Sequence, residues 1–445
     1  MDFISNKEPQ IAIMLKEIGI DKIEDLLSSI PESLRLPKPT HDDGLSEYEI
    51  LKHMEALAQK NSYASFDNYL GAGAYEHHIP ALTSMITSRS EFLTAYTPYQ
   101  AEASQGMLQS IFEFQKAICL LTGMDVANAS VYDGASACAE AVLMGLRINK
   151  TRTKVLVSET LHPHYRGVIE QYLSNQSVEI VTIPFKADGQ LNLQNLQEDC
   201  AVLIVQYPNF LGNIEDFTSI FKPAHEKGIV TIICANPLVY GLYRTAAEIG
   251  ADIAVGDCQP FGLPLHFGGP YVGYIATLSK HVRQLPGRIV GETLDTEGRT
   301  GYVLTLQARE QHIRREKATS NICTNQALAA LGTLVTLLWY GKQGIYELAL
   351  TNYQRTAYLK SELEKIPGVK SLNQQPFLNE FAIAFPKKVE DVLEVYRKEK
   401  IEPGLPLGNY YPELKNYLLV AVTETKNKQQ LDKYVEIAKK MAGSA

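Results

Sequence analysis

The stretch Asp252-Ile-Ala-Val-Gly-Asp-Cys-Gln-Pro-Phe-Gly-Leu-Pro-Leu-His-Phe-Gly-Gly-Pro270 decides the fold of this chain. Its first part, Ile253–Val255, is short and wholly apolar, which predicts a buried strand. Glycine and proline residues then punctuate a loop, and a second apolar strand, Tyr271–Ile275, follows it. Because proline restricts its own backbone and the two strands are fixed in a core, such a loop can hold one side chain in a constant place.

The side chain near the start of this loop determines what the loop can do. Enzymes that depend on pyridoxal phosphate carry a lysine in a loop of this kind, and its amine forms a Schiff base with the cofactor. The corresponding position here is Gln259. An amide nitrogen is not nucleophilic and cannot form that bond. The stretch therefore predicts a cofactor loop that lacks its reactive group.

The composition is that of an ordinary globular protein large enough for more than one domain. The chain has 445 residues, of which 45% are hydrophobic and 21% are charged. A net charge of −8 argues against a nucleic-acid surface. The six cysteines include no Cys-x-x-Cys pair, so we expect neither a zinc site nor a redox motif.

The sequence gives no sign of export or of membrane insertion. The apolar run Ile11–Leu15 is too short for a signal peptide, and the late first arginine, Arg35, is unlike a mitochondrial presequence. The longest uncharged stretch, 318–341, is polar in its first half, which predicts a buried helix rather than a membrane span. We therefore expect a cytoplasmic protein that binds neither membranes nor nucleic acids.

Three parts can be told apart along the chain. Residues 1–65 show helical spacing of apolar residues broken by Pro31, Pro37 and Pro39, which predicts a helical extension. Residues 66–330 alternate helices with short strands rich in Val and Ile, the pattern of a parallel sheet covered on both faces. Residues 331–445 predict a smaller α/β domain. The strands that we expect in the large part lie at 155–157, 178–183, 201–206, 229–234, 253–255 and 271–275. Two long helices are expected after them, at about 322–340 and 343–365.

Some positions near predicted strand ends are candidates for a cofactor site. Gly134-Ala-Ser136 opens a helix, where backbone N–H groups can hold a phosphate, although a plain helix cap explains it equally well. Asn236 follows a central strand, where a cofactor enzyme of this plan has an aspartate that pairs with the pyridine nitrogen. A neutral amide cannot form that ion pair, so a simple turn is the favoured interpretation. His162-Pro-His164 lacks accompanying carboxylates, and we expect no metal site.

Three further segments are polar and irregular. Residues 71–80 and 94–100 are rich in glycine or tyrosine and follow neither strand nor helix periodicity, which is typical of functional or interface loops. The third segment, Thr319-Ser-Asn-Ile-Cys-Thr324, precedes a helix expected to begin near Ile322. Its hydroxyls are candidates for capping that helix or for contacting an anion across a dimer interface.

These segments together resemble a known family, the P-protein of the glycine cleavage system, and within it the N-terminal subunits of split glycine decarboxylases. The resemblance covers nearly the whole chain. It rests on several blocks in the same order: Gly71-Ala-Gly-Ala-Tyr75, His77-His-Ile-Pro80, Thr97-Pro-Tyr-Gln100, Ser104-Gln-Gly106, Asp133-Gly-Ala135 and Glu316-Lys-Ala-Thr-Ser-Asn-Ile-Cys-Thr324.

The resemblance implies an α/β fold of the aspartate-aminotransferase type, fold type I of pyridoxal phosphate enzymes. It implies a mainly parallel seven-stranded sheet in a large domain, a smaller C-terminal α/β domain and a helical N-terminal extension. It also implies a two-plus-two heterotetramer with a homologous P-protein subunit 2. That second subunit carries the Schiff-base lysine and holds pyridoxal phosphate covalently, so Gln259 is a degenerate Schiff-base position. The assembly decarboxylates glycine and passes the aminomethyl group to the lipoyl arm of the H-protein.

Particular residues of this chain acquire expected roles from the same resemblance. None is expected to be catalytic by itself. A site shared with the second subunit is expected at Tyr96, Thr97, Tyr99, Gln100, His77 and His78. A contact with the phosphate of the other subunit's cofactor is expected at Thr319, Ser320 and Asn321.

Two other interpretations stay open. The chain could be a self-sufficient pyridoxal phosphate lyase or desulfurase that uses another lysine, in which case the purified chain would carry cofactor colour. It could instead be a scaffold without catalytic work that only binds a partner. A neighbouring gene for a homologous chain with His-Lys-Thr before a glycine-rich loop would favour the decarboxylase subunit.

Overall fold

The computed structural model describes residues 6–36, 44–193, 196, 199–322 and 324–443, which fall into two compact units, Met1–Ala64 and Ser65–Ala445. The first unit contains the helices α1 (Glu8–Ile18) and α2 (Glu47–Ala58) and no buried residue in either. Two of the prolines expected to interrupt its helices, Pro37 and Pro39, lie outside the described residues.

The second unit is built on a seven-stranded sheet with the strand order β2-β8-β7-β6-β5-β3-β4. Neighbouring strands from β4 to β7 run parallel, whereas β8 is antiparallel to both of its neighbours. Strands β6, β7 and β8 are buried along their whole length, which explains their continuous apolar sequences. The mainly parallel α/β fold is confirmed. The strands are β2 (Val126–Ala127), β3 (Lys154–Ser158), β4 (Glu179–Ile183), β5 (Cys200–Tyr207), β6 (Val230–Ala235), β7 (Ile253–Asp257) and β8 (Gly273–Thr277).

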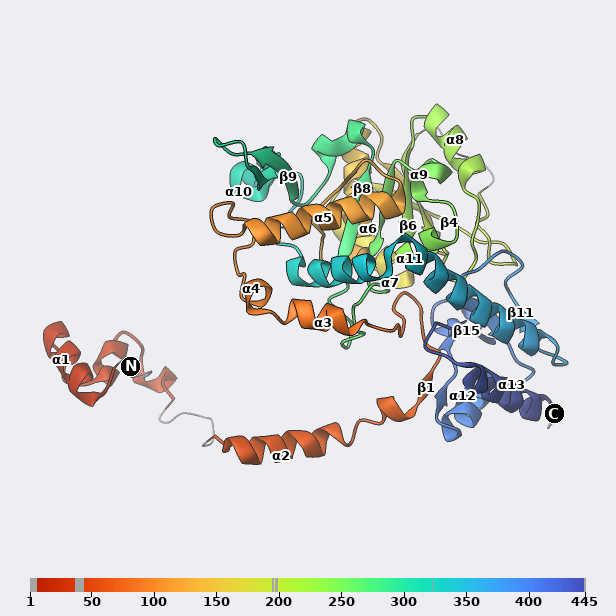
Figure 1. Cartoon of the computed structure of the whole chain (residues 1–445), viewed down its shortest axis with the longest axis horizontal. Helices are drawn as coiled ribbons and strands as arrows, with labels where there is room; N and C mark the ends of the chain where they lie inside the picture. The colour runs from red at the N-terminus through yellow and green to blue at the C-terminus, as the bar shows by residue number, and fades with distance from the viewer. Residues whose placement is uncertain (1–5, 37–43, 194–195, 197–198, 323, 444–445) are drawn as a thin grey trace. The chain divides into compact units, whose positions relative to one another are not determined.

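Helices cover both faces of this sheet (Figure 1). Along β5, Leu203 and Val205 pack on one face, in a core shared with α5 (Gln105–Thr122) and the start of α11 (Ala327–Glu364). Val202 and Ile204 point to the other face, in a core shared with the helices α6 and α7. This alternation is the two-residue period of a strand. Helices α6 (Gly134–Ile148) and α7 (Pro163–Leu173) thus cover one face, and α8 (Thr218–Glu226) and α9 (Ala246–Ile249) pack with α5 and α11 on the other.

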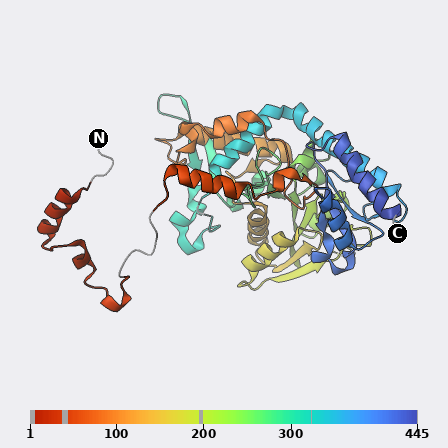
Figure 2. The same cartoon turned by 90° about the horizontal axis from the view of Figure 1, so that it is seen from below.

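Helix α11 links the large sheet to a C-terminal layer, as Figures 1 and 2 both show. It is interrupted at Gly341, whose φ of 59° and ψ of −177° are not helical. The two long helices expected from the sequence are therefore present, but the first begins at Ala327 rather than near Ile322. In the described part of the chain, none of the helices has the length and apolarity needed to cross a membrane.

The C-terminal layer is a four-stranded antiparallel sheet in the order β11-β12-β15-β14, packed against two helices. Residues from the start of the second unit also belong to it: β1 (Asp67–Asn68) pairs with β13 (Ile401–Glu402), and Tyr69 lies in its core. The boundaries 1–65, 66–330 and 331–445 stay predictions. The other elements here are β11 (Lys370–Ser371), β12 (Glu380–Ala384), α12 (Val389–Lys398), β14 (Leu405–Pro406), β15 (Tyr417–Ala421) and α13 (Lys428–Gly443).

Several elements were not expected from the sequence, and one of them is a hairpin. An antiparallel hairpin is formed by β9 (Ile289–Leu294) and β10 (Thr300–Thr305). Only Ile289 and Val290 of β9 are buried, and no residue of β10 is, so the two strands lack the continuous apolar character that marked the strands of the large sheet.

Candidate functional site

Gln259, which the sequence predicts to occupy the position of a cofactor lysine, is buried and hydrogen bonds to a second segment of the chain. Its Nε2 donates to the carbonyl oxygens of Tyr75 and Leu263 at 2.7 and 3.1 Å, and its Oε1 accepts from the Tyr75 N–H at 2.9 Å. Both ends of the amide are thus used by backbone groups. This side chain is therefore a structural clamp on residues 71–75, which we call the clasped segment.

The clasped segment is held by two further side chains. The Glu380 carboxylate accepts from the Ala72 N–H at 2.5 Å and from the Tyr75 hydroxyl at 2.6 Å. His162 Nδ1 lies 3.1 Å from the backbone N–H of His164, so its Nε2 carries the proton and donates to the Ala72 carbonyl at 2.8 Å. Side chains that belong to the large sheet, to α7 and to the C-terminal layer therefore all hydrogen bond to the clasped segment.

The space that remains beside the clasped segment is too small for pyridoxal phosphate. The cavity measures about 30 Å³ and is lined by Tyr75, His162, Tyr165, Asn236, Asp257 and Glu380, among others. Ligand sites usually measure about 300–1,000 Å³, whereas 30 Å³ suffices for a water molecule or two. Among the residues that the structure describes, no lysine lines the cavity. The residues present do not fit the cofactor.

The two strand-end candidates have structural roles. Asp133 caps α6, and its carboxylate accepts from the Ser136 N–H at 2.7 Å, so Gly134-Ala-Ser136 is a plain helix start. The Asn236 Oδ1 accepts from the Leu238 N–H at 3.0 Å and begins a short 3-10 turn, which is the favoured interpretation. A cofactor phosphate at the start of α6 would need hydrogen-bond donors, but the acidic side chain of Asp133 lies there. A pyridinium beside Asn236 would need an anion, but this amide is neutral.

Burial sets the protonation of this site. Burial raises the pKa of the Asp257 carboxyl to about 7, against the lowering effect of the Tyr165 hydroxyl that bonds to it at 2.7 Å. Burial likewise raises the pKa of Glu380 to about 7, although the Ala72 N–H and the Tyr75 hydroxyl lower it. Burial depresses the pKa of His162 to about 4, so this ring is neutral near pH 7. His162 therefore supplies no positive charge for a phosphate.

The tyrosine loop, residues 94–100, divides into exposed and inward-facing side chains. Tyr96 is 95% exposed, and Thr97 and Gln100 are exposed as well. Tyr99 is turned inward: its hydroxyl donates to the Asn325 side chain, and the Arg288 guanidinium lies 3.7 Å from its ring centroid. The structure thus leaves three of the four expected contact residues facing outward.

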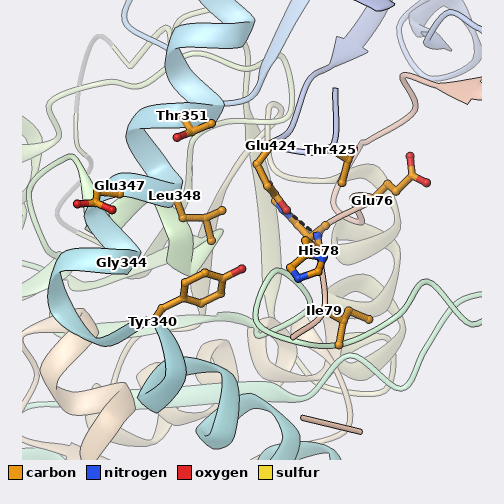
Figure 3. A pocket seen from close by; sticks show the side chains of 11 residues that line it. Glu76, His78, Ile79, Tyr340, Gly344, Glu347, Leu348, Thr351, Glu424 and Thr425 are labelled. Atoms are coloured by element: carbon orange, nitrogen blue, oxygen red, sulfur yellow. Dashed lines mark hydrogen bonds and ion pairs between the residues drawn. The ribbon is translucent and has the colours of Figure 1, made fainter. Parts of the chain in front are cut away.

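The two histidines lie beside an open hollow of about 810 Å³ (Figure 3). In Figure 3, Tyr340 and Leu348 of α11 form one wall, and His78 and Glu424 lie opposite. The His77 Nδ1 is 2.9 Å from the Glu424 carboxylate, and the His78 N–H donates to the same group at 2.6 Å. Burial opposes charge on Glu424, but the hydrogen bond and charge of His77 hold its pKa at about 2. His77 is thus bound inside the chain, whereas His78 is exposed.

The expectation that Thr319 and Ser320 cap a helix is wrong. Helix α11 begins at Ala327, too far along the chain for either residue to be its cap. The Ser320 hydroxyl instead donates to Glu140 Oε1 at 2.7 Å, and Glu140 is 1% exposed. Asn321 is exposed and Thr319 is half-buried. Cys323, in the same segment, lies outside the described residues.

Sequence reasoning missed the carboxylates that organise this site. Glu380 and Glu424 come from the C-terminal layer, roughly 300 residues from their partners, and no local pattern marked them. Asp257 did have a signal, since it is the one charged residue between Asp252 and Lys280. Within the described ranges, no three His, Cys, Asp or Glu side chains are grouped as a metal site would require.

We predict that Gln259→Ala lowers the free energy of unfolding by about 3 kcal/mol. The substitution leaves the buried Tyr75 N–H and carbonyl without partners and opens a small cavity. Urea unfolding followed by circular dichroism measures the change. Gln171→Ala, on the exposed side of α7, is the matched control and should change stability by less than about 0.5 kcal/mol. Equal stability of the two variants would contradict the clamp.

We predict a pH-dependent stability that Glu380→Gln reduces. The Glu380 pKa is about 7 in the folded chain and 4.5 in the reference state, so the folded chain binds the proton more tightly. Its stabilising contribution is therefore complete below about pH 4.5 and is lost as the pH rises through about 7. Between about pH 4.5 and 7, the free energy of unfolding of Glu380→Gln should therefore fall by about 3 kcal/mol less than that of the wild type.

Urea unfolding at pH 5, 6, 7 and 8 tests this expectation. Some slope should persist in the variant, because the Asp257 carboxyl has a pKa raised in the same direction. Identical slopes for the wild type and Glu380→Gln would show that the carboxyl does not titrate in this range.

Comparisons with known proteins agree with this geometry. The sequence profile described as "Glycine cleavage system P-protein" matches residues 1–438. A protein of Protochlamydia amoebophila named "Probable glycine dehydrogenase (decarboxylating) subunit 1" is 62% identical over 445 residues, covering 99% of this chain and 100% of that protein. A protein of the same name from Desulforamulus reducens is 48% identical, covering 97% and 98% of the two chains.

The solved structures point the same way. The crystal structure of a glycine decarboxylase (P-protein) of the glycine cleavage system, in inhibitor-bound form, superposes with a TM-score of 0.91 at 41% identity, covering 99% of this chain and all of that one. A sphingosine-1-phosphate lyase of Burkholderia pseudomallei superposes with a TM-score of 0.66 at 13% identity over 92% of this chain and 93% of its own, which shows the shared fold alone. The chain belongs to the glycine cleavage system P-protein family.

Proposed function

We propose that this chain is the subunit of glycine decarboxylase that supports the reaction without holding the cofactor. The observation that carries the proposal concerns Gln259, which lies at the predicted lysine position. Both the nitrogen and the oxygen of its amide hydrogen bond to the clasped segment. Pyridoxal phosphate is then held by a homologous, lysine-bearing chain, which we call the companion subunit. When bound there, the cofactor supplies the electron sink for the loss of carbon dioxide from glycine.

The relatives that are named subunit 1 support the existence of a companion. Within the proposal the two chains form a two-plus-two heterotetramer, and the aminomethyl group left from glycine passes to the lipoyl arm of the H-protein. The cytoplasmic location stays a prediction. The role of this chain is to close the shared site, exclude water and orient the substrate against the cofactor.

The outward-facing part of the tyrosine loop is the best candidate for that role. Tyr96, Thr97 and Gln100 are exposed in the isolated chain, so each is free to enter a site on the companion subunit. Tyr99 supports the loop from within through Asn325. His78 is exposed beside the open hollow, and His77 positions it through their shared partner Glu424.

One observation and one experiment separate this proposal from the alternatives. A self-sufficient lyase would need a cleft for its cofactor, and the cavity beside Gln259 measures about 30 Å³. A scaffold without catalytic work would leave glycine-dependent carbon dioxide exchange unchanged when its exposed loop is altered. Tyr96→Ala distinguishes a supportive subunit from a scaffold when sedimentation shows that the variant complex is fully assembled, because loss of exchange then reflects the shared site and not assembly.

We predict that the isolated chain forms no covalent adduct with pyridoxal phosphate. The test is visible absorbance after cofactor addition, followed by borohydride reduction and peptide mapping. Gln259→Lys alone should also give no active enzyme, because the cleft stays filled and Asn236 leaves the pyridine nitrogen without an anion. A stoichiometric pyridoxyl-lysine at one site in the wild-type chain would contradict the proposal.

We predict different outcomes for Thr319→Ala and Ser320→Ala in the assembled enzyme. A hydroxyl that donates to a phosphate contributes about 1.5–3 kcal/mol, so losing Thr319 should weaken cofactor retention by roughly ten- to a hundred-fold. The Ser320 hydroxyl already donates to the buried Glu140, so its loss should lower the melting temperature without changing cofactor affinity. Titration of pyridoxal phosphate measures both variants. Unchanged affinity in Thr319→Ala would remove the phosphate contact of Thr319, and Asn321→Ala tests the contact of Asn321 in the same titration.

A further inference from the structure

A largely buried arginine lies against the tyrosine loop. Arg288 directly precedes β9, and its side chain is 18% exposed. Its guanidinium carbon lies 3.7 Å from the centroid of the Tyr99 ring, and its Nε lies 3.5 Å from Oε2 of Glu310, a carboxylate that is 11% exposed. A planar guanidinium can stack on a ring and pair with a carboxylate at the same time. Arg288 is therefore held in place and covers one face of the Tyr99 ring.

The contacts of Tyr99 form a closed circuit with Arg288. The Tyr99 hydroxyl donates to the Asn325 side chain, whose Nδ2 donates to the Ala129 carbonyl at 2.7 Å. The Ala129 N–H in turn donates to the Arg288 carbonyl at 2.8 Å. The ring is thus fixed at its hydroxyl and on its face by groups that are also bonded to each other.

The hairpin that begins after Arg288 is fastened to α5, and Figure 1 shows the two elements side by side. Gln115 of this helix uses both ends of its amide on Val290, in two hydrogen bonds of 2.9 Å. Gln105 does the same with Tyr302, at 2.8 and 2.9 Å. The Gln105 Nε2 also donates, at 2.7 Å, to the carbonyl of Ala101, the residue after the tyrosine loop. The hairpin, α5 and the end of the loop therefore form one frame around Arg288.

The tyrosine loop has neither helix nor strand to hold its outward-facing side chains. The backbone hydrogen bonds within it are local, from the Tyr96 N–H to Thr94 at 2.9 Å and from the Gln100 N–H to Thr97 at 3.4 Å. Tyr99 joins the loop to the rest of the second unit through its ring contact and its hydroxyl. The direction of the outward-facing side chains therefore depends on where the Tyr99 ring is held.

We propose that Arg288 is a positioning residue of the decarboxylation reaction, which acts through the Tyr99 ring on the direction of Tyr96, Thr97 and Gln100. This inference rests on the proposed function, and it adds to that function a residue outside the tyrosine loop. It also gives the hairpin β9–β10 a role, as the mount of Arg288. A small displacement of groups that orient a substrate lowers the rate of the chemical step more than it lowers substrate binding.

Two other roles for Arg288 make different predictions. A residue that touches substrate directly would matter whether or not the Tyr99 ring is present. A residue that serves the fold alone would change the melting temperature without changing the turnover of folded, assembled enzyme. The burial of Arg288 between Tyr99 and Glu310 favours an indirect role, because its side chain would have to leave both partners to reach a substrate.

The first experiment measures kcat and the KM for glycine in the assembled enzyme. Arg288→Met should lower kcat by about ten-fold and change KM by less than about three-fold, because the tyrosine loop is present but misdirected. Tyr99→Leu should show the same division between kcat and KM. Arg299→Met is the matched control, since Arg299 is 72% exposed on the same hairpin and pairs with Asp295. Its kcat should stay within about two-fold of the wild type.

The substitution also leaves the Glu310 carboxylate without this cation, so Arg288→Met should melt at a lower temperature than the wild type. Rates are therefore measured well below the lowest melting temperature of the set, on complexes that sedimentation shows to be assembled. Wild-type kcat in Arg288→Met would overturn the positioning role. Failure of the variant to assemble would also overturn it, because Arg288 would then serve assembly.

A double-mutant cycle tests whether Arg288 acts through the ring. In a Tyr99→Leu background, Arg288→Met should cause no further loss of kcat, because the contact is already absent. In a Tyr99→Phe background the ring remains, and the loss should again be about ten-fold. An equal loss in the Leu and Phe backgrounds would overturn the proposal in favour of a direct contact with substrate.

Hydrogen exchange of the isolated full chain gives a readout that does not depend on activity. Peptides from residues 94–104 should exchange about ten-fold faster in Arg288→Met than in the wild type or Arg299→Met, because the loop loses its support. Peptides from the buried strand β5 are the internal control and should not change. Unchanged exchange in residues 94–104 would overturn the support of the loop by Arg288.

Failure of the proposed function has its own signature. A wild-type complex that assembles and yet shows no glycine-dependent carbon dioxide exchange would reject the decarboxylase role, and hydrogen exchange would still decide whether Arg288 supports the loop. An active complex whose kcat is insensitive to Arg288→Met would reject only the positioning role.

Discussion

The hydrogen bonds between the Gln259 amide and the Tyr75 backbone are the constraint on which the rest of the site depends. They fix the clasped segment, whose other contacts reach Glu380 in the C-terminal layer and His162 at the start of α7. A lysine could not replace this clamp, because an ammonium donates hydrogen bonds but cannot accept the Tyr75 N–H. The residue that lacks reactivity thus has a structural use that the reactive residue could not serve.

The electrostatics of the site follow from that packing. Asp257 and Glu380 are buried without cationic partners, and they tolerate burial because each accepts hydrogen bonds and binds a proton more readily than in water. Glu424 shows the opposite arrangement, in which His77 favours the charged carboxylate. These carboxylates tie distant segments together. Among the residues that line the cavity beside Gln259, they leave no positive charge of the kind that a phosphate requires.

Much of the fold could be predicted because its signals are local. Buried parallel strands such as β6 and β7 appear as continuous apolar runs, and Gly341 falls between the two predicted long helices. The hairpin β9–β10 was missed because its half-exposed strands lack that signal. The Ser320–Glu140 bond joins residues 180 positions apart, so only the fold brings them together. Gln259 could be identified from the sequence because a lysine is expected at its position in the loop. Its hydrogen bonds to Tyr75 could not be predicted, because the two residues are 184 positions apart.

Under the proposed function, the division of work between two chains rests on packing rather than on one side chain. A lysine at position 259 would face a cleft filled by the clasped segment, a neutral Asn236 and an acidic cap at Asp133. Each of these features stabilises the present structure, so each would have to change at a cost in stability before a cofactor could enter. Substitutions on the surface do not carry this cost in stability, because exposed side chains can be replaced without disturbing the core. Packing has closed the inner site of this chain and has left its outer surface as the part that can serve a partner.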